Sequence, residues 1–235
     1  MPISQICRRL RVSEATARRD LTAVAAGGHI TRTWGGALAD YNAHIASIDE
    51  RFRRAQSAKG RIAAVAAAMV PASGVVFLDA GTTIVAVARA LARRRGLLGL
   101  KVVTNSLPVA SALGGLQGVA LHVLGGELLD RQAALFGPRA LRALREWRFD
   151  AAFFGGESAD AVGISNSHPD VVAFQRFVVQ RSGQSYFCLD GTKLGGGAPH
   201  CVAGWDDFSA LISDASTARL RAAGLHDQVA KLITA

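Results

Sequence analysis

The sequence predicts an α/β protein in which a mainly parallel sheet, covered by helices, follows a small module of two helices and a hairpin. Three observations carry this prediction. Short β-branched runs alternate with Ala- and Leu-rich segments from about residue 60 onward, several of these runs end in Gly, Thr, Asn, Ser or Asp, and arginines gather near the N-terminus. Strands that alternate with helices build parallel sheets with both faces covered. We expect a small module over residues 1–38, a linker over 39–58 and an α/β domain over 59–235.

The composition is that of a folded protein from a reducing compartment. Of the 235 residues, 50% are hydrophobic and 19% are charged, which supplies a core and excludes disorder for most of the chain. Three widely separated cysteines are typical of the cytosol rather than of a disulfide framework. The apolar run 62–78 is broken by Pro71 and Gly74, so it predicts a helix, a turn and a strand. We expect a cytoplasmic protein with no membrane partner.

The positive charge is concentrated at one end of the chain. The net charge is +9, from 27 Lys and Arg against 18 Asp and Glu. Residues 1–36 hold six arginines against Glu14 and Asp20, and so contribute +4 of this excess. Such an excess favours an anionic partner, whether nucleic acid, a membrane surface or a phosphorylated molecule.

Two helices are predicted in the N-terminal module. The first covers residues 2–10. The second begins after Ser13, a good N-cap residue, and ends before Gly27, a good residue to follow a helix. The apolar residues expected to face inward are Ile3, Ile6 and Leu10 on the first helix and Ala17, Leu21 and Val24 on the second.

The segment after the second helix predicts a small basic hairpin. Residues 29–36 hold β-formers between glycines and carry Arg32. A single Arg-rich helix is more often the solvated face of an amphipathic helix than a binding element. A short helix, a capped basic helix and a basic hairpin in succession favour a winged helix-turn-helix, whose second helix contacts DNA with its early turns.

These same residues resemble a known DNA-binding signature. The runs 12–21 and 32–37 are similar to that of DeoR-family bacterial transcription regulators. The resemblance implies that four residues of the second helix and its cap face DNA and that one lies in the wing: Ser13, Thr16, Arg18, Arg19 and Arg32.

The chain departs from the family pattern at two places in this module. Trp34 stands where family members usually have His. The family's domain also begins with an additional helix, so we expect the true start to lie upstream. Without that helix several apolar side chains lack a covering layer, namely Ile3, Ile6, Leu10, Leu21 and Val24.

The larger domain is predicted to hold a series of buried strands and covering helices. Helices are expected over residues 84–95 and 107–113. The strands are expected at 75–79, 101–104, 119–124, 151–154, 185–189 and 210–212.

Small and polar residues follow five of these strands. Ligands of open parallel sheets bind beyond the carboxyl ends of the strands, so these residues predict a polar pocket. Gly81, Thr82 and Thr83 come where a strand gives way to a helix, and free N–H groups at a helix N-terminus attract phosphate. Lys193 adds a positive charge. Each of these motifs alone is typical of an ordinary turn, so the prediction of a pocket depends on all five occurring together.

The same stretches resemble the effector domain of DeoR-family regulators, from about residue 50 to 214, with matches that include Arg51 and Lys59. The resemblance implies a fold related to sugar-phosphate isomerases and coenzyme A transferases that senses a phosphorylated sugar or related metabolite. At Gln175 the chain departs from the family, which has a Lys near this position. The effector-binding residues so implied are Asp79, Gly81, Thr82, Thr83, Asn105, Ser106, Gly125, Gly126, Asp190 and Lys193.

The leading hypothesis is a homo-oligomeric repressor of a sugar catabolic operon that binds operator DNA and is released by a phosphorylated metabolite. We predict no cofactor, no metal site and no catalytic residue, because the six histidines lack ligand spacing and the serines lack a nucleophile motif. Two alternatives stay open. One is a sugar-phosphate isomerase or transferase that uses acidic residues at the strand ends, and the other is a sensor that no longer binds DNA.

Overall fold

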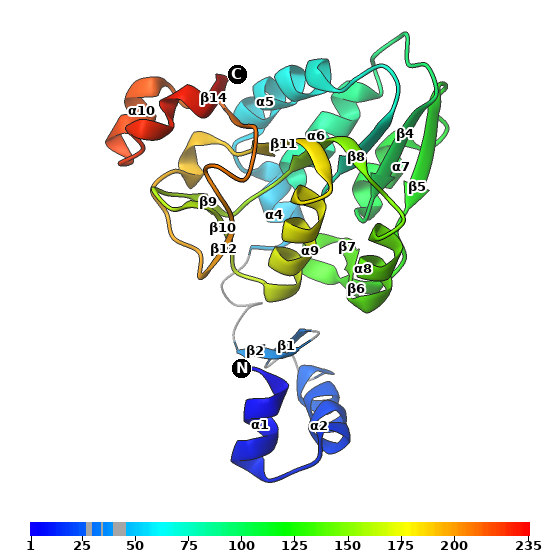
Figure 1. The fold of residues 1–235 in the computed structure, drawn as a ribbon, viewed down its shortest axis with the longest axis vertical. Coiled ribbons are helices and arrows are strands. Elements are labelled where there is room, and N and C mark those ends of the chain that lie inside the picture. Colours follow the sequence, from blue (N-terminus) through cyan, green and yellow to red (C-terminus); the bar gives the residue numbers. More distant parts are fainter. Residues whose placement is uncertain (27–29, 34, 40–45) are drawn as a thin grey trace.

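The computed structural model describes residues 1–26, 30–33, 35–39 and 46–235. The N-terminal module holds two helices and a two-stranded antiparallel hairpin, as the sequence predicts (Figure 1). Gly27, Gly28 and Trp34 lie outside the described residues. The elements of the module are α1 (Ile3–Leu10), α2 (Glu14–Ala26), β1 (Ile30–Thr33) and β2 (Gly36–Ala39).

Local chemistry sets the turn between α1 and α2. The backbone turns left-handed at Arg11, with φ of 53°, and ends α1. The Ser13 hydroxyl then accepts the Thr16 N–H at 3.1 Å, which is the predicted N-cap. Ile6 and Ala17 are buried between the helices. The prediction that Leu10 faces inward is wrong, because no described element covers that end of the pair and the side chain is 66% exposed.

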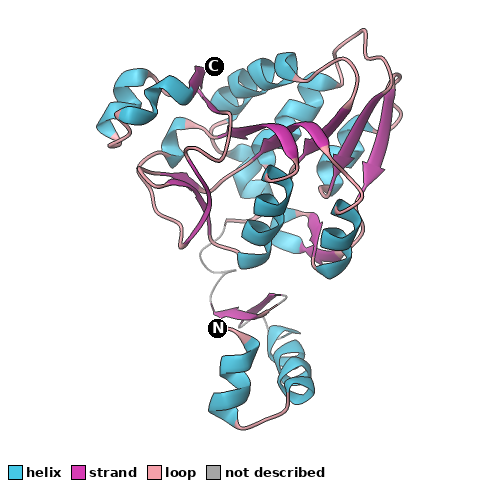
Figure 2. Cartoon of the chain, in the orientation of Figure 1, coloured by secondary structure: helices cyan, strands magenta, loops and turns pink. Residues whose placement is uncertain are grey.

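The α/β domain is built on a seven-stranded sheet in which every neighbouring pair is parallel (Figure 2). This confirms the predicted fold class. The strand order is β14-β13-β11-β8-β3-β4-β5. The bounds are β3 (Val75–Leu78), β4 (Leu100–Thr104), β5 (Val119–Val123), β8 (Phe149–Phe154), β11 (Ser182–Cys188), β13 (Ala210–Ser213) and β14 (Leu232–Thr234).

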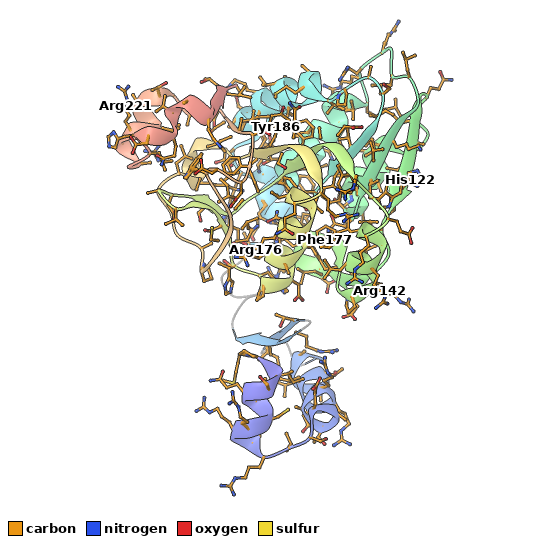
Figure 3. All side chains as sticks on the ribbon, in the orientation of Figure 1. His122, Arg142, Arg176, Phe177, Tyr186 and Arg221 are labelled. Atoms are coloured by element: carbon orange, nitrogen blue, oxygen red, sulfur yellow. The ribbon has the colours of Figure 1, made fainter. Side chains whose placement is uncertain are left out.

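Alternating side chains send the core to both faces of this sheet. Leu78 and Phe153 enter one hydrophobic cluster, whereas Phe77 and Phe154 enter the other. Figure 3 labels Tyr186 on β11, which belongs to the first cluster. The helices packed in the first cluster are α5 (Gln56–Met69), α6 (Thr82–Leu91) and α7 (Leu107–Leu113), and those in the second are α8 (Pro138–Leu144), α9 (Pro169–Val179) and α10 (Thr217–Ala222).

The predicted helix over 84–95 is displaced toward the N-terminus. It begins at Thr82, directly after Gly81, and ends at Leu91. Two short-range backbone bonds follow, from Arg93 to Ala90 and from Arg94 to Leu91, so the α-helical pattern stops there. The predicted helix over 107–113 is confirmed.

Several smaller elements have no counterpart in the sequence prediction. They are too short to show a clear period. The helix α4 (Ile48–Arg53) and the start of α5 lie within the segment expected as a linker. The others are the edge strand β14, the hairpin β6 (Glu127–Leu129) and β7 (Ala134–Phe136), and the antiparallel strands β9 (Ser158–Ala159), β10 (Gly163–Asn166) and β12 (His200–Gly204).

The strand order places a switch point at the middle of the sheet. From β3 the chain proceeds through β4 to the edge at β5, and it returns with β8 on the other side of β3. Ligands of open α/β sheets bind where the order reverses in this way, beyond the carboxyl ends of the strands. In the described part of the chain, no helix combines the length and apolar character that crossing a membrane requires.

Candidate effector site

A cavity of about 340 Å3 lies at this switch point. Its wall is formed in part by the segments that follow three strands: 79–83 after β3, 155–157 after β8, and 190–193 after β11. Three of the five strand ends predicted to form a pocket therefore come together. The sequence-predicted effector residues that line it are Asp79, Gly81, Thr82, Thr83, Asp190 and Lys193.

The other two strand ends do not line this cavity, so four of the predicted effector residues lie elsewhere. The β6–β7 hairpin covers the ends of β4 and β5. Asn105 Nδ2 donates to the Leu135 carbonyl at 3.2 Å, and the Ser106 side chain caps α7 by accepting the Val109 N–H. Gly125 and Gly126 lead into β6, and Gly126 approaches the backbone of β7 at Phe136. These residues hold the hairpin rather than the cavity wall.

The N-terminus of α6 faces the cavity. Gly81 precedes it with φ of +116° and ψ of 151°, a conformation that L side chains avoid. None of the described side chains caps this turn. Thr82 and Thr83 are buried at its start. Backbone N–H groups and the helix dipole here favour a bound anion.

Four cationic side chains line the same cavity: Arg51, Arg54, Lys59 and Lys193. Lys59 is 6% exposed, and its Nζ donates to the carbonyl oxygens of Arg51 and Arg54. Lys193 Nζ donates to the Gly156 carbonyl at 2.5 Å. Burial lowers the pKa of both lysines, and Asp190 opposes this shift.

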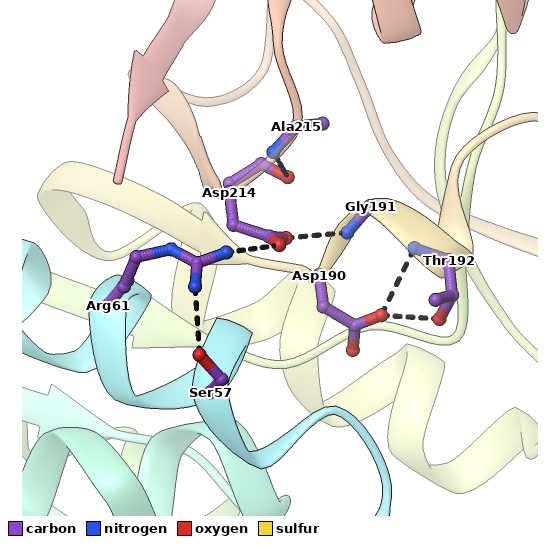
Figure 4. Close-up of polar contacts among 8 residues, drawn as sticks. Ser57, Arg61, Asp190, Gly191, Thr192, Asp214 and Ala215 are labelled. Carbon is purple, nitrogen blue, oxygen red and sulfur yellow. Dashed lines mark hydrogen bonds and ion pairs between the residues drawn. The ribbon is translucent and has the colours of Figure 1, made fainter.

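The turn that carries Lys193 is fixed by two aspartates (Figure 4). Asp190 accepts hydrogen bonds from the backbone N–H and hydroxyl of Thr192. Asp214, which follows β13, accepts the Gly191 N–H at 2.8 Å and pairs with Arg61 of α5 at 2.9 Å. The turn is therefore tied to both β13 and α5.

The wall beside α9 is different, because it presents an acid and two amides from three elements: Asp79 after β3, Gln175 on α9 and Asn166 at the end of β10. Asp79 is 1% exposed, and its Oδ2 accepts from Gln175 Nε2 at 2.6 Å. Gln175 Nε2 also donates to the Gly155 carbonyl at 3.0 Å, and its Oε1 accepts from Asn166 at 2.6 Å. Burial raises the pKa of Asp79 to about 7, and the Gln175 hydrogen bond opposes this only in part.

Sequence reasoning missed several residues of the cavity wall. Lys59, which the family resemblance matches, is absent from the predicted effector-binding residues, although it shares a helix face with Ile62, Ala63 and Ala66, and a lysine in an apolar stripe is a sign of function. The others are supplied by elements without a sequence signal, or by the neighbourhood of α9: Arg54, Gln132, Glu157, Asn166 and Gln175. Within the described ranges, His, Cys, Asp and Glu form no group of three that could hold a metal ion.

In the N-terminal module, the five predicted DNA-contacting residues lie on α2, its cap and β1. Ser13 Oγ and Thr16 Oγ1 are 2.8 Å apart, so the two hydroxyls bond to each other. Arg18 pairs with Glu14 one turn earlier at 2.6 Å. Arg19 is 80% exposed and lies 3.5 Å from Asp20. Arg32 is exposed on β1.

The fold and the site define a two-part protein: a helix-turn-helix with a hairpin, followed by an α/β domain whose cationic cavity lies at the switch point. Residues 1–42 match the DeoR-like helix-turn-helix domain, and residues 54–215 match the DeoR C terminal sensor domain. The chain belongs to the DeoR family.

Known relatives extend this comparison along most of the chain. The HTH-type transcriptional repressor GlcR of Bacillus subtilis is 31% identical over 211 residues, which are 89% of this chain and 80% of the relative. The lactose phosphotransferase system repressor of Streptococcus mutans is 29% identical over 195 residues, covering 82% and 77%. Among solved structures, ribose 5-phosphate isomerase A of Methanocaldococcus jannaschii aligns with a TM-score of 0.44 and 16% identity, covering 59% and 54%.

Proposed function

We propose that this chain is an oligomeric repressor of a sugar catabolic operon, which leaves its operator when a phosphorylated sugar binds the cavity. Residues 1–38 bind DNA, and residues 59–235 sense the metabolite without turning it over, together with Arg51 and Arg54 from the segment 39–58 that connects the two. The names of the two relatives support a repressor role for this chain, and the name of the lactose phosphotransferase system repressor supports a sugar operon as its target. The observation that carries the sensing role is the meeting of Lys59, Lys193 and the free α6 N-terminus at one cavity.

The charge arrangement explains why a phosphate suits this cavity. Lys59 and Lys193 donate to backbone carbonyls, which carry only partial negative charge. Burial lowers the pKa of each lysine, so the charged form of each ammonium group is disfavoured in the free protein. A phosphate between these ammonium groups and the N–H groups of α6 supplies the missing negative charge.

DNA binding is tested by fluorescence anisotropy of the chain with the DNA upstream of its own gene, against a scrambled fragment, at two salt concentrations. Preference for the native fragment, with affinity that falls as salt rises, supports an operator-binding protein. If there is no preference, the reading frame is extended upstream by one helix. Failure of the extended chain as well would exclude operator binding.

Effector binding is tested by calorimetry with pentose and hexose monophosphates. Thr82→Ala and Lys193→Ala each remove one proposed phosphate contact, and Lys101→Ala, at an exposed position on β4, is the matched control. We expect weaker binding for the first two variants and wild-type binding for the control. Equal affinity for all three would place the phosphate elsewhere. Because coupling is reciprocal, operator DNA should weaken effector binding by the factor by which the effector weakens operator binding.

A further inference from the structure

One wall of the cavity carries a buried acid with an unused acceptor. Asp79 accepts from Gln175 through Oδ2, but its other oxygen, Oδ1, has no hydrogen-bond partner among the described residues. A buried acceptor without a donor is unfavourable, because it has lost its hydrogen bonds to water without replacing them. Since Asp79 lines the cavity, a donor on the ligand can reach this atom.

The neighbour of this acid is neutral and its orientation is fixed. Gln175 is 2% exposed and uses both ends of its amide, donating to Asp79 and Gly155 and accepting from Asn166. These bonds determine which end of the amide faces Asp79. The α9 wall therefore compensates the Asp79 carboxylate with hydrogen bonds and not with a positive charge.

The cations belong to a different part of the wall. Burial lowers the pKa of both Lys59 and Lys193, Asp190 opposes this shift, and the neighbouring charge of Arg51 adds to it. Burial is the main cause of the raised Asp79 pKa, and hydrogen bonds from Gln175 and from neighbouring backbone N–H groups oppose it. Lys59 and Lys193 donate to backbone carbonyls, and none of the described Lys or Arg side chains donates to Asp79, so the cations and this acid have separate hydrogen-bond partners in the cavity.

We propose that Gln175 makes the cavity select effectors whose only anionic group is the phosphate, and which also present a hydrogen-bond donor to Asp79. This inference rests on the proposed function, because it assumes that a phosphorylated sugar binds here. A hydroxyl or an ammonium group satisfies Oδ1. A carboxylate or a second phosphate beside Asp79 meets a buried acid to which none of the described Lys or Arg side chains donates.

A matched ligand series tests the proposal on the full chain. Calorimetry compares glucose 6-phosphate and glucosamine 6-phosphate with 6-phosphogluconate, and ribose 5-phosphate with 5-phosphoribonate. We expect the aldonates to bind at least about tenfold more weakly than the sugars, the scale on which unbalanced buried charges act. The comparison of glucose 6-phosphate with glucosamine 6-phosphate shows whether the donor is a hydroxyl or an ammonium group.

Variants at position 175 distinguish the effect of side-chain charge on ligand preference from the effect of side-chain shape. Gln175→Lys places a cation beside Asp79 and should remove or reverse the preference against aldonates. Gln175→Met keeps the length of the side chain without charge, so it should weaken all ligands but retain their ranking. Gln117→Lys adds the same charge in an exposed loop and is the control. Circular dichroism establishes that each variant folds.

Each outcome decides a different statement. Binding of sugars over aldonates in the wild type, with the preference lost only in Gln175→Lys, supports the proposal. Equal binding of aldonates and sugars, or an unchanged preference in Gln175→Lys, overturns it and leaves the sensing function intact. No binding by any of the five ligands, with wild type and all variants, overturns the phosphate-sensing function and this inference together.

Discussion

The side-chain amide of Gln175 donates to Asp79 Oδ2 at 2.6 Å, and it joins α9 to the carboxyl end of β3 across 96 positions of sequence. Both residues line the effector cavity, so this bond connects the part of its wall beside α9 to the part that follows β3. Because the amide is neutral, it leaves the buried carboxylate with an incomplete set of partners. The pKa of Asp79 is accordingly raised by burial to about 7.

Asp79→Asn should change how stability depends on pH. The native carboxyl has a pKa of about 7, against an ordinary value of 3.8, so between about pH 4 and 7 the native state binds more protons than the unfolded state. The free energy of unfolding therefore falls as pH rises through this window. The variant lacks this titration. Urea unfolding at pH 5, 6, 7 and 8 should show its stability rising relative to wild type up to about pH 7; a constant difference would contradict the prediction.

His168→Asn should reveal a pH dependence of stability with the opposite sign to that of Asp79. His168 is 1% exposed, and its Nδ1 accepts the Asp170 N–H at the start of α9. Burial lowers its pKa from 6.5 to about 4, so the native state binds fewer protons than the unfolded state between these values, and stability is lost as pH falls. Asn keeps a capping acceptor. From pH 6.5 to 4, wild type should lose stability relative to His168→Asn; the exposed His226→Asn serves as control.

The sequence carried enough information to predict the sheet but not its order. Strands and their polar ends could be read from β-branched runs followed by Gly, Thr and Asp. Which ends meet depends on which strands are neighbours, and that is set by long-range packing. Asp79 and Asp190 share the cavity because β3 and β11 both lie beside β8, whereas Asn105 is occupied by the β6–β7 hairpin. Short elements such as this hairpin leave no period to detect.

The N-terminal module was predicted best where capping and turn chemistry are local. Ser13 marks the start of α2, and the hairpin follows from its flanking glycines. Burial was harder to predict. Helical spacing places Leu10 on the same face as Ile6, but only Ile6 meets α2 closely enough to be buried. Period shows which face is apolar, and tertiary contacts decide how much of it is covered.

Arg19→Ala should weaken operator binding in a salt-dependent way. The guanidinium is 80% exposed on α2, so it is available for a phosphate contact at little desolvation cost. Loss of one such contact should weaken binding to all DNA sequences and reduce the slope of log affinity against log salt by about 1. Arg221→Ala, at an exposed position on α10 of the sensor domain, is the matched control. An unchanged slope for Arg19→Ala would remove this residue from the DNA interface.

Alanine at two glycines should act in opposite directions. Gly81 holds φ of +116° before α6, where a side chain is strained, so Gly81→Ala should lower the free energy of unfolding by about 1–3 kcal/mol. The new Cβ would meet open space, so the loss comes from backbone strain and not from a clash. Gly60 lies exposed within α5, also with nothing near its Cβ, and Gly60→Ala should raise stability by about 0.5–1 kcal/mol. Urea unfolding measures both changes. An unchanged free energy of unfolding for Gly81→Ala would mean that the backbone before α6 relaxes out of its positive φ, and that the anion-facing geometry of this helix end is lost as well.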